Sequence, residues 1–118
     1  MTATRHARGV AAEEAACAAL QAEGWTVLRR RARTPAGEVD VVAERDGLLA
    51  LIEVKRRASF AAAAEALAPR QRARLPAAAE VLLAEHPDWG RAGIRFDVIV
   101  VNGEGQMRRI ADAFRAGD

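Results

Sequence analysis

The sequence predicts a single α/β domain in which helices flank one central mixed sheet, with elements in the order αβββαββ. Three observations lead to this class: two alanine-rich segments of helical composition, several runs rich in β-branched residues, and an Asp46-Gly47 pair that joins two of those runs. A chain of 118 residues is long enough for one compact core and too short for a second. We therefore expect residues 1–118 to form one domain.

The first half of the chain predicts one helix and three strands. "ATRHARGVAAEEAACAALQAEG" contains mostly strong helix formers, with Thr4 placed to cap the helix and Gly24 placed to end it. "WTVLRRRAR" then has the aromatic and β-branched content of a strand, and "TPAG" indicates a turn. The runs "EVDVVAER" and "LLALIEVKR" flank the Asp-Gly pair, which favours a tight antiparallel hairpin.

The second half predicts one helical region and two strands. Residues 59–86 are helical in character, but Pro69 and Pro76 divide them, and a proline inside a helix costs about 3 kcal/mol. The sequence leaves open whether the helix is kinked or broken. After the loop "HPDWGRAG" come the strand "IRFDVIVV", the turn "NGEG", the shorter strand "QMRRIA" and a tail with the composition of a helical turn.

Composition and charge restrict the function classes. The net charge of +2 gives a weak overall field, so any attraction for phosphate must come from clusters of arginine. Cys17 is the only cysteine, which excludes an internal disulfide and a cysteine-rich zinc site and fits a reducing compartment. Glu13 and Glu14 interrupt the N-terminal alanine-rich segment, and no apolar run reaches the length of a membrane span. We expect a cytoplasmic protein with no membrane partner.

The hairpin predicts a group of charged side chains on one face. If the Asp-Gly pair forms a two-residue turn, paired residues have numbers that sum to 93, so Asp40 faces Glu53 and Glu38 faces Lys55. Side chains alternate along a strand, which places these four groups on one face. The other face then carries the apolar residues Val39, Val41, Ala43, Ala50, Ile52 and Val54.

These charges suggest a metal site. Directly opposed carboxylates have Cβ atoms about 4.5–5.5 Å apart and repel one another, whereas Mg²⁺ or Mn²⁺ would hold them together through oxygen ligands. Lys55 is the only lysine beside seventeen arginines, which suggests a position that needs a compact ammonium group. It could orient a water molecule or stabilise charge on a reacting phosphate. The alternative is an ordinary ion pair at the strand edge among Asp40, Glu53 and Lys55.

The same residues resemble a known family. "GEVDVVAERDG…LIEVKRR" is similar to the core motif of the YraN family of small bacterial proteins and, more broadly, of the PD-(D/E)xK nuclease superfamily, close to the Holliday-junction resolvases. The resemblance implies a restriction-endonuclease-like fold and a Mg²⁺- or Mn²⁺-dependent site that hydrolyses DNA, including branched DNA. In that site Asp40, Glu53 and Glu13 hold the metal and Lys55 assists catalysis. It also implies a homodimer, because symmetric cutting of a junction needs two sites.

Glu13 and the arginines allow two interpretations each. Glu13 shares its helical spacing with Cys17 and Leu20, so it either faces the sheet and needs a partner there, or reaches solvent. The basic side chains either bind the phosphates of nucleic acid or are solvated charges. A nuclease-like fold that binds nucleic acid or protein without cleaving is the alternative to the enzyme. The residues that we expect to contact nucleic acid are Arg57, Arg56, Arg33, Arg70 and Gln71.

Overall fold

The computed structural model describes the backbone of residues 5–58, 60 and 69–114, and the side chains of residues 9–58, 60 and 74–111. The elements are α1 (Arg5–Ala22), β1 (Thr26–Thr34), β2 (Gly37–Arg45), β3 (Leu48–Arg56), α2 (Pro69–Glu85), β4 (Gly93–Val101) and β5 (Met107–Phe114). The predicted order is confirmed. The expected helix cap at Thr4 lies outside the described residues.

Helix α1 ends as its sequence predicts. Gly24 has a φ of 91°, a left-handed conformation that glycine adopts without a steric penalty. The N–H groups of Gly24 and Trp25 donate to the carbonyls of Gln21 and Leu20, both at 3.0 Å, which satisfies the last turn of the helix. This ending turns the chain directly into β1.

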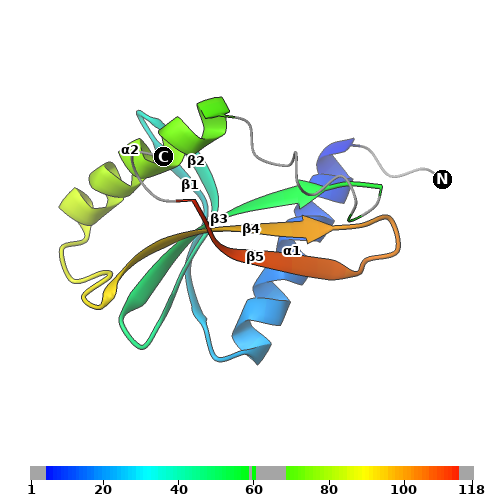
Figure 1. Cartoon of the computed structure of the whole chain (residues 1–118), viewed down its shortest axis with the longest axis horizontal. Coiled ribbons are helices and arrows are strands. Elements are labelled where there is room, and N and C mark those ends of the chain that lie inside the picture. The colour runs from blue at the N-terminus through cyan, green and yellow to red at the C-terminus, as the bar shows by residue number, and fades with distance from the viewer. Residues whose placement is uncertain (1–4, 59, 61–68, 115–118) are drawn as a thin grey trace.

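The five strands form one mixed sheet in the order β1-β2-β3-β4-β5 (Figure 1). Neighbouring strands are antiparallel except β3 and β4, which are parallel along their whole length. A parallel pair needs a long crossover, and α2 lies in the connection between these two strands. Strand β5 extends to Phe114, so the helical turn predicted for the tail is wrong as far as residue 114.

The two helices cover opposite faces of the sheet (Figure 1). Each contributes a stripe of buried residues, and the central strands supply the facing side chains by alternation. The cluster on the α1 side contains Ala12, Ala16, Cys17, Leu20, Trp25, Val41, Ala43, Ala50, Ile52, Ile99 and Val101. The cluster on the α2 side contains Ala32, Val39, Val42, Leu49, Leu51, Leu75, Ala78, Ala79, Leu82 and Phe96.

Pro76 does not break α2. The helix begins at Pro69, where a proline loses no intrahelical hydrogen bond, and continues through Pro76 to Glu85. Leu75, Ala78, Ala79 and Leu82 on its apolar stripe are all buried against the sheet. This packing favours the helix on both sides of the proline and offsets the hydrogen bond that the proline cannot donate.

No helix in the described part of the chain is both long enough and apolar enough to cross a membrane.

Candidate functional site

The site lies where β2 and β3 separate. Their pairing follows the predicted register from Arg45 opposite Leu48 to Val41 opposite Ile52 and ends there. Beyond this point β2 stays paired with β1 and β3 stays paired with β4, so the two strands diverge. The predicted direct pairs of Asp40 with Glu53 and of Glu38 with Lys55 are therefore wrong.

Asp40 occupies the fork between the strands. Its Oδ2 accepts a hydrogen bond of 2.8 Å from the backbone N–H of Val54. The pairing of β2 with β3 has already ended at this point, so Asp40 takes the place of a backbone acceptor from β2. The alternation of side chains is interrupted here, because Val41 packs on the α1 side while Val39 packs on the α2 side. The prediction that Val39 and Val41 share one face is thus wrong, since strict alternation requires an undistorted strand.

Strand β1 is also irregular beside Asp40. Arg31 lies between Arg30 and Ala32, which pair with Val41 and Val39, and its φ of 51° is rare for a residue with a side chain. Its guanidinium reaches α1, where Nε and one terminal nitrogen donate to the two oxygens of Glu13 at 2.9 and 3.4 Å. Glu13 therefore faces the sheet and has a partner there, and the solvent-facing alternative is wrong.

Strand β3 contributes an acid that is almost fully buried. Glu53 is 5% exposed, and its Oε1 lies 3.2 Å from the Nζ of Lys55. Arg74 of α2 donates to both carboxylate oxygens over longer distances of 3.4 and 3.5 Å. The stem of Arg74 crosses Gly37, where a Cβ would collide with its Cγ and Cδ. Two cations from different elements thus share one carboxylate.

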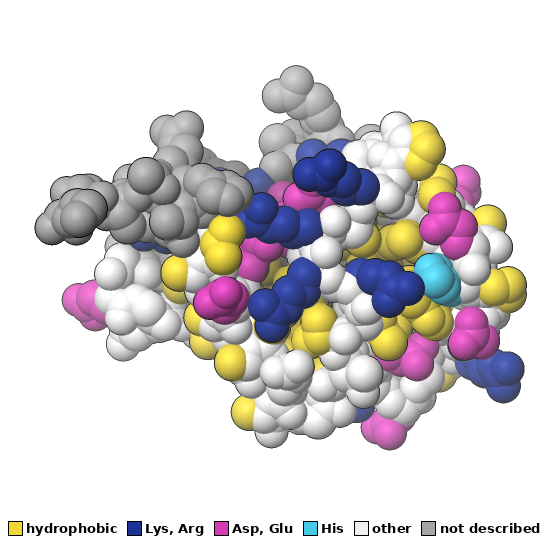
Figure 2. All heavy atoms as spheres, turned by 180° about the vertical axis from the view of Figure 1, so that it is seen from behind, with side chains coloured by type: hydrophobic (Ala, Val, Ile, Leu, Met, Phe, Trp, Pro, Cys, Tyr) yellow, Lys and Arg dark blue, Asp and Glu magenta, His cyan; other side chains and the backbone are white. Residues whose placement is uncertain are grey.

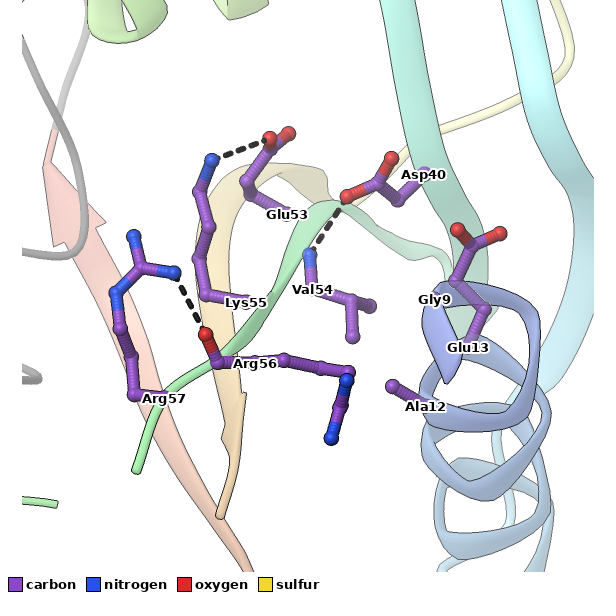
Figure 3. A pocket seen from close by; sticks show the side chains of 9 residues that line it. All are labelled: Gly9, Ala12, Glu13, Asp40, Glu53, Val54, Lys55, Arg56 and Arg57. Atoms are coloured by element: carbon purple, nitrogen blue, oxygen red, sulfur yellow. Dashed lines mark hydrogen bonds and ion pairs between the residues drawn. The ribbon is translucent and has the colours of Figure 1, made fainter. Parts of the chain in front are cut away.

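These groups line one open pocket of about 600 Å³ (Figure 3). Figure 3 shows Glu53 and Lys55 from β3, Asp40 from β2 and Glu13 from α1 around the same space. The lining residues are Gly9, Ala12, Glu13, Asp40, Glu53, Val54, Lys55, Arg56 and Arg57. All four residues predicted to form the catalytic site are therefore brought together, although they come from three elements.

The carboxyl group of Asp40 is unusually basic. Its pKa is raised from 3.8 to about 6, first by burial and then by the negative charges of Glu53 and Glu13, against the lowering effects of the Val54 hydrogen bond and Lys55. Both neighbouring acids already have counter-ions. Glu13 pairs with Arg31, and Glu53 pairs with Lys55 and Arg74. Asp40 is the acid whose ionised form gains most from an added cation.

The donor atoms suit a hard divalent cation. Carboxylate oxygens are the ligands that Mg²⁺ and Mn²⁺ prefer, and Mg²⁺ is commonly held by one or two carboxylates with water and substrate completing its shell. Among the described side chains, no three acidic, histidine or cysteine residues lie close enough together to form a ready-made cluster. Of the acids that line the pocket, Asp40 and Glu53 are the two that could hold such a cation, with Glu13 nearby.

The predicted nucleic-acid contacts divide into three groups. Arg56 and Arg57 line the pocket, and Arg57 also donates to the Arg56 carbonyl at 2.7 Å. Arg33 lies outside the pocket lining, exposed and 3.7 Å from Glu38. The side chains of Arg70 and Gln71 lie outside the described part of the chain. Figure 2 shows basic side chains gathered across one face with acidic side chains among them.

The sequence analysis did not identify the arginines that pair with the acids of the site. Arg31 and Arg74 were among the basic residues of the chain, but no local pattern assigned Arg31 to Glu13 or Arg74 to Glu53. For Arg74 a signal exists, since it precedes Ala78 by one helical turn and lies at the margin of the apolar stripe of α2. For Arg31 the signal is absent, because its left-handed backbone redirects a strand side chain.

Fold and site together define a small mixed α/β protein with an acid- and lysine-lined pocket at a strand fork. The chain belongs to UPF0102, an uncharacterised protein family whose model matches residues 12–101. It is similar to a UPF0102 protein of Granulibacter bethesdensis, with 60% identity over 107 residues that cover 91% of this chain and 68% of the relative. It is also similar to a UPF0102 protein of Azorhizobium caulinodans, with 50% identity over 92% of this chain and 83% of the relative. These matches confirm the predicted family, and they do not extend to the wider superfamily.

Proposed function

We propose that this protein is a Mg²⁺- or Mn²⁺-dependent nuclease that hydrolyses phosphodiester bonds of DNA, on a restriction-endonuclease-like fold of the PD-(D/E)xK superfamily. The observation that carries the proposal is the convergence of Asp40, Glu53, Lys55 and Glu13 on one pocket. The residues come from α1, β2 and β3, and the pKa of the half-buried Asp40 carboxyl is raised to about 6, a shift that a nearby cation would oppose. An ion pair at a strand edge would not need this convergence.

Each residue has a distinct role in the proposed reaction. Asp40 and Glu53 would hold the cation, which supplies Lewis-acid stabilisation of charge on the phosphate. Lys55 is paired with Glu53 at 3.2 Å, and its ammonium group would orient the attacking water or stabilise the charged transition state. Glu13, held by Arg31, maintains negative charge beside Asp40. Arg56 and Arg57 at the pocket rim would bind the DNA backbone.

A catalytically silent nucleic-acid-binding module is the second candidate. It is favoured by the ion pairs that already engage Glu13 and Glu53, since both acids are neutralised without a metal. In this case the basic rim would bind phosphate and the acids would only stabilise the fork.

A cleavage assay separates the two candidates. End-labelled linear duplex, single-stranded, flap and four-way-junction DNA would be incubated with Mg²⁺ or Mn²⁺ and the wild type, Asp40→Asn or Lys55→Ala. Glu80→Gln, which changes an exposed acid on α2, is the matched control. Circular dichroism would establish that each variant is folded. We expect cation-dependent cutting that both site variants lose and the control keeps.

The outcome of this assay also identifies the substrate. Preference for the four-way junction would support the resolvase-like form of the proposal and predicts a homodimer, which light scattering would detect. No cutting, or cutting that survives both substitutions, would reject the catalytic assignment of these residues and leave the binding module.

A further inference from the structure

Arg74 is held beside the pocket in an incompletely satisfied state. Its hydrogen bonds to Glu53, at 3.4 and 3.5 Å, are longer than the 2.7–2.9 Å typical of charge-assisted bonds. Its Nε is buried and has no hydrogen-bond partner among the described residues. The glycine at position 37 leaves room for its stem, so the guanidinium is placed at the site with donor capacity to spare.

A divalent cation on Glu53 would compete with Arg74. Glu53 already has the ammonium group of Lys55 at 3.2 Å, so a cation would be the third positive partner of a single carboxylate. Arg74 makes the longer contacts and is a third exposed, whereas Lys55 is 15% exposed. Arg74 is therefore the partner that the carboxylate loses most easily.

The charge balance of the pocket calls for an anion once a cation is bound. The acids are Glu13, Asp40 and Glu53, whereas the basic groups that line the pocket or pair with these acids are Arg31, Lys55, Arg56, Arg57 and Arg74. The basic groups outnumber the acids before any cation is added. A guanidinium released from Glu53 offers two parallel N–H groups, which match the oxygens of a phosphodiester.

We propose that Arg74 is a phosphodiester-binding residue that exchanges partners, pairing with Glu53 in the free protein and with a backbone phosphate of the substrate when a divalent cation occupies the pocket. This inference rests on the proposed function and deepens it. Cation and phosphodiester then bind with positive coupling, because the cation frees the guanidinium and the phosphate neutralises the added charge. The coupling is reciprocal by thermodynamic linkage.

The test measures Mn²⁺ affinity directly, without turnover. Free Mn²⁺ would be followed by electron paramagnetic resonance while it is titrated into the protein, with and without saturating dimethyl phosphate as a minimal phosphodiester. The variants are Arg74→Gln, Arg74→Lys and, as a matched loss of charge at an exposed loop position, Arg91→Gln. Thermal melting of each variant reports on folding.

We expect dimethyl phosphate to tighten Mn²⁺ binding by the wild type about tenfold, within the usual range of coupling between sites. Arg74→Gln removes the competitor, so Mn²⁺ alone binds roughly fivefold tighter, as for the loss of one partly exposed ion pair. The same variant should lose most of the coupling, whereas Arg74→Lys keeps part of it and Arg91→Gln keeps all of it. A tighter Mn²⁺ affinity together with a lost effect of dimethyl phosphate is a signature that general destabilisation does not produce.

Two kinds of result would overturn the inference and leave the proposed function standing, and a third would overturn both. If Arg74→Gln matches the wild type in Mn²⁺ affinity and in coupling, or lowers the Mn²⁺ affinity together with the melting temperature, Arg74 has only a structural role. If the wild type binds Mn²⁺ but dimethyl phosphate has no effect on it, the exchange of partners does not occur. If the wild type does not bind Mn²⁺ at all, the cation site and the proposed function fail as well.

Discussion

Asp40→Asn should stabilise the metal-free protein at neutral and alkaline pH, although it alters a predicted catalytic residue. The folded state raises the pKa of Asp40 from 3.8 to about 6, so folding favours the protonated carboxyl. The stability that this proton contributes is fully present below pH 3.8 and is lost as the pH rises through 6. Asparagine is neutral at every pH and keeps an oxygen to accept the Val54 hydrogen bond, so it avoids this loss.

The size of the effect follows from the shift. About two pKa units correspond to about 3 kcal/mol of unfolding free energy over the whole titration. Between pH 4.5 and 8, where most of that titration occurs, linkage gives about 2 kcal/mol. The quantity to follow is the difference in unfolding free energy between the variant and the wild type, and how this difference changes with pH. Other titrating groups are common to both proteins, so their effects largely cancel.

Urea unfolding at several pH values between 4.5 and 8, with EDTA present, would measure this difference. Asp88→Asn, at an exposed loop position, is the matched control and should show little dependence on pH. An Asp40→Asn stability difference that stays constant with pH, or that becomes less favourable for the variant at high pH, would refute the assignment of a half-buried, destabilised carboxylate to the fork.

Three further substitutions test the contacts around the site. Arg31→Gly should be more stable than Arg31→Ala by about 1 kcal/mol in urea unfolding, because the left-handed backbone penalises a Cβ; the opposite order, usual in strands, would contradict the observed φ of 51°. Gly37→Ala should lower the unfolding free energy by about 2–3 kcal/mol, because the φ of Gly37 is 135° and the added Cβ would collide with Arg74. In a double-mutant cycle, adding Arg74→Ala should recover part of that cost. Additive effects would show that the collision is relieved elsewhere. Asp97→Ala should cost about 3–5 kcal/mol in thermal or urea unfolding, because it strips the bidentate partner, at 2.9 Å, from Arg95; a loss below 1 kcal/mol would show that this buried pair is not important for stability.

Most of the fold was predictable because its signals are local. Alanine-rich periodic segments, β-branched runs and the Asp-Gly turn specified the element order, and the turn fixed the register as far as Val41 opposite Ile52. The candidate site residues Glu13, Asp40, Glu53 and Lys55, which the sequence analysis groups together, line one pocket, and their catalytic role stays a prediction. The tail and the path through Pro76 were less predictable, because pairing with β4 and packing of α2 override local preference.

The sequence by itself determined which chemical groups this protein brings to its site: three carboxylates, one lysine and a basic rim. Only the tertiary structure decided how those groups are paired. Divergence of β2 from β3 replaced the expected acid pair with the Asp40 to Val54 hydrogen bond, and arginines from β1 and α2 became the counter-ions of Glu13 and Glu53. The physical reason is that these two kinds of interaction act over different separations along the chain. Propensity and alternation act between neighbours in the chain, whereas desolvation and ion pairing depend on distances between elements that exist only after the sheet and helices have packed.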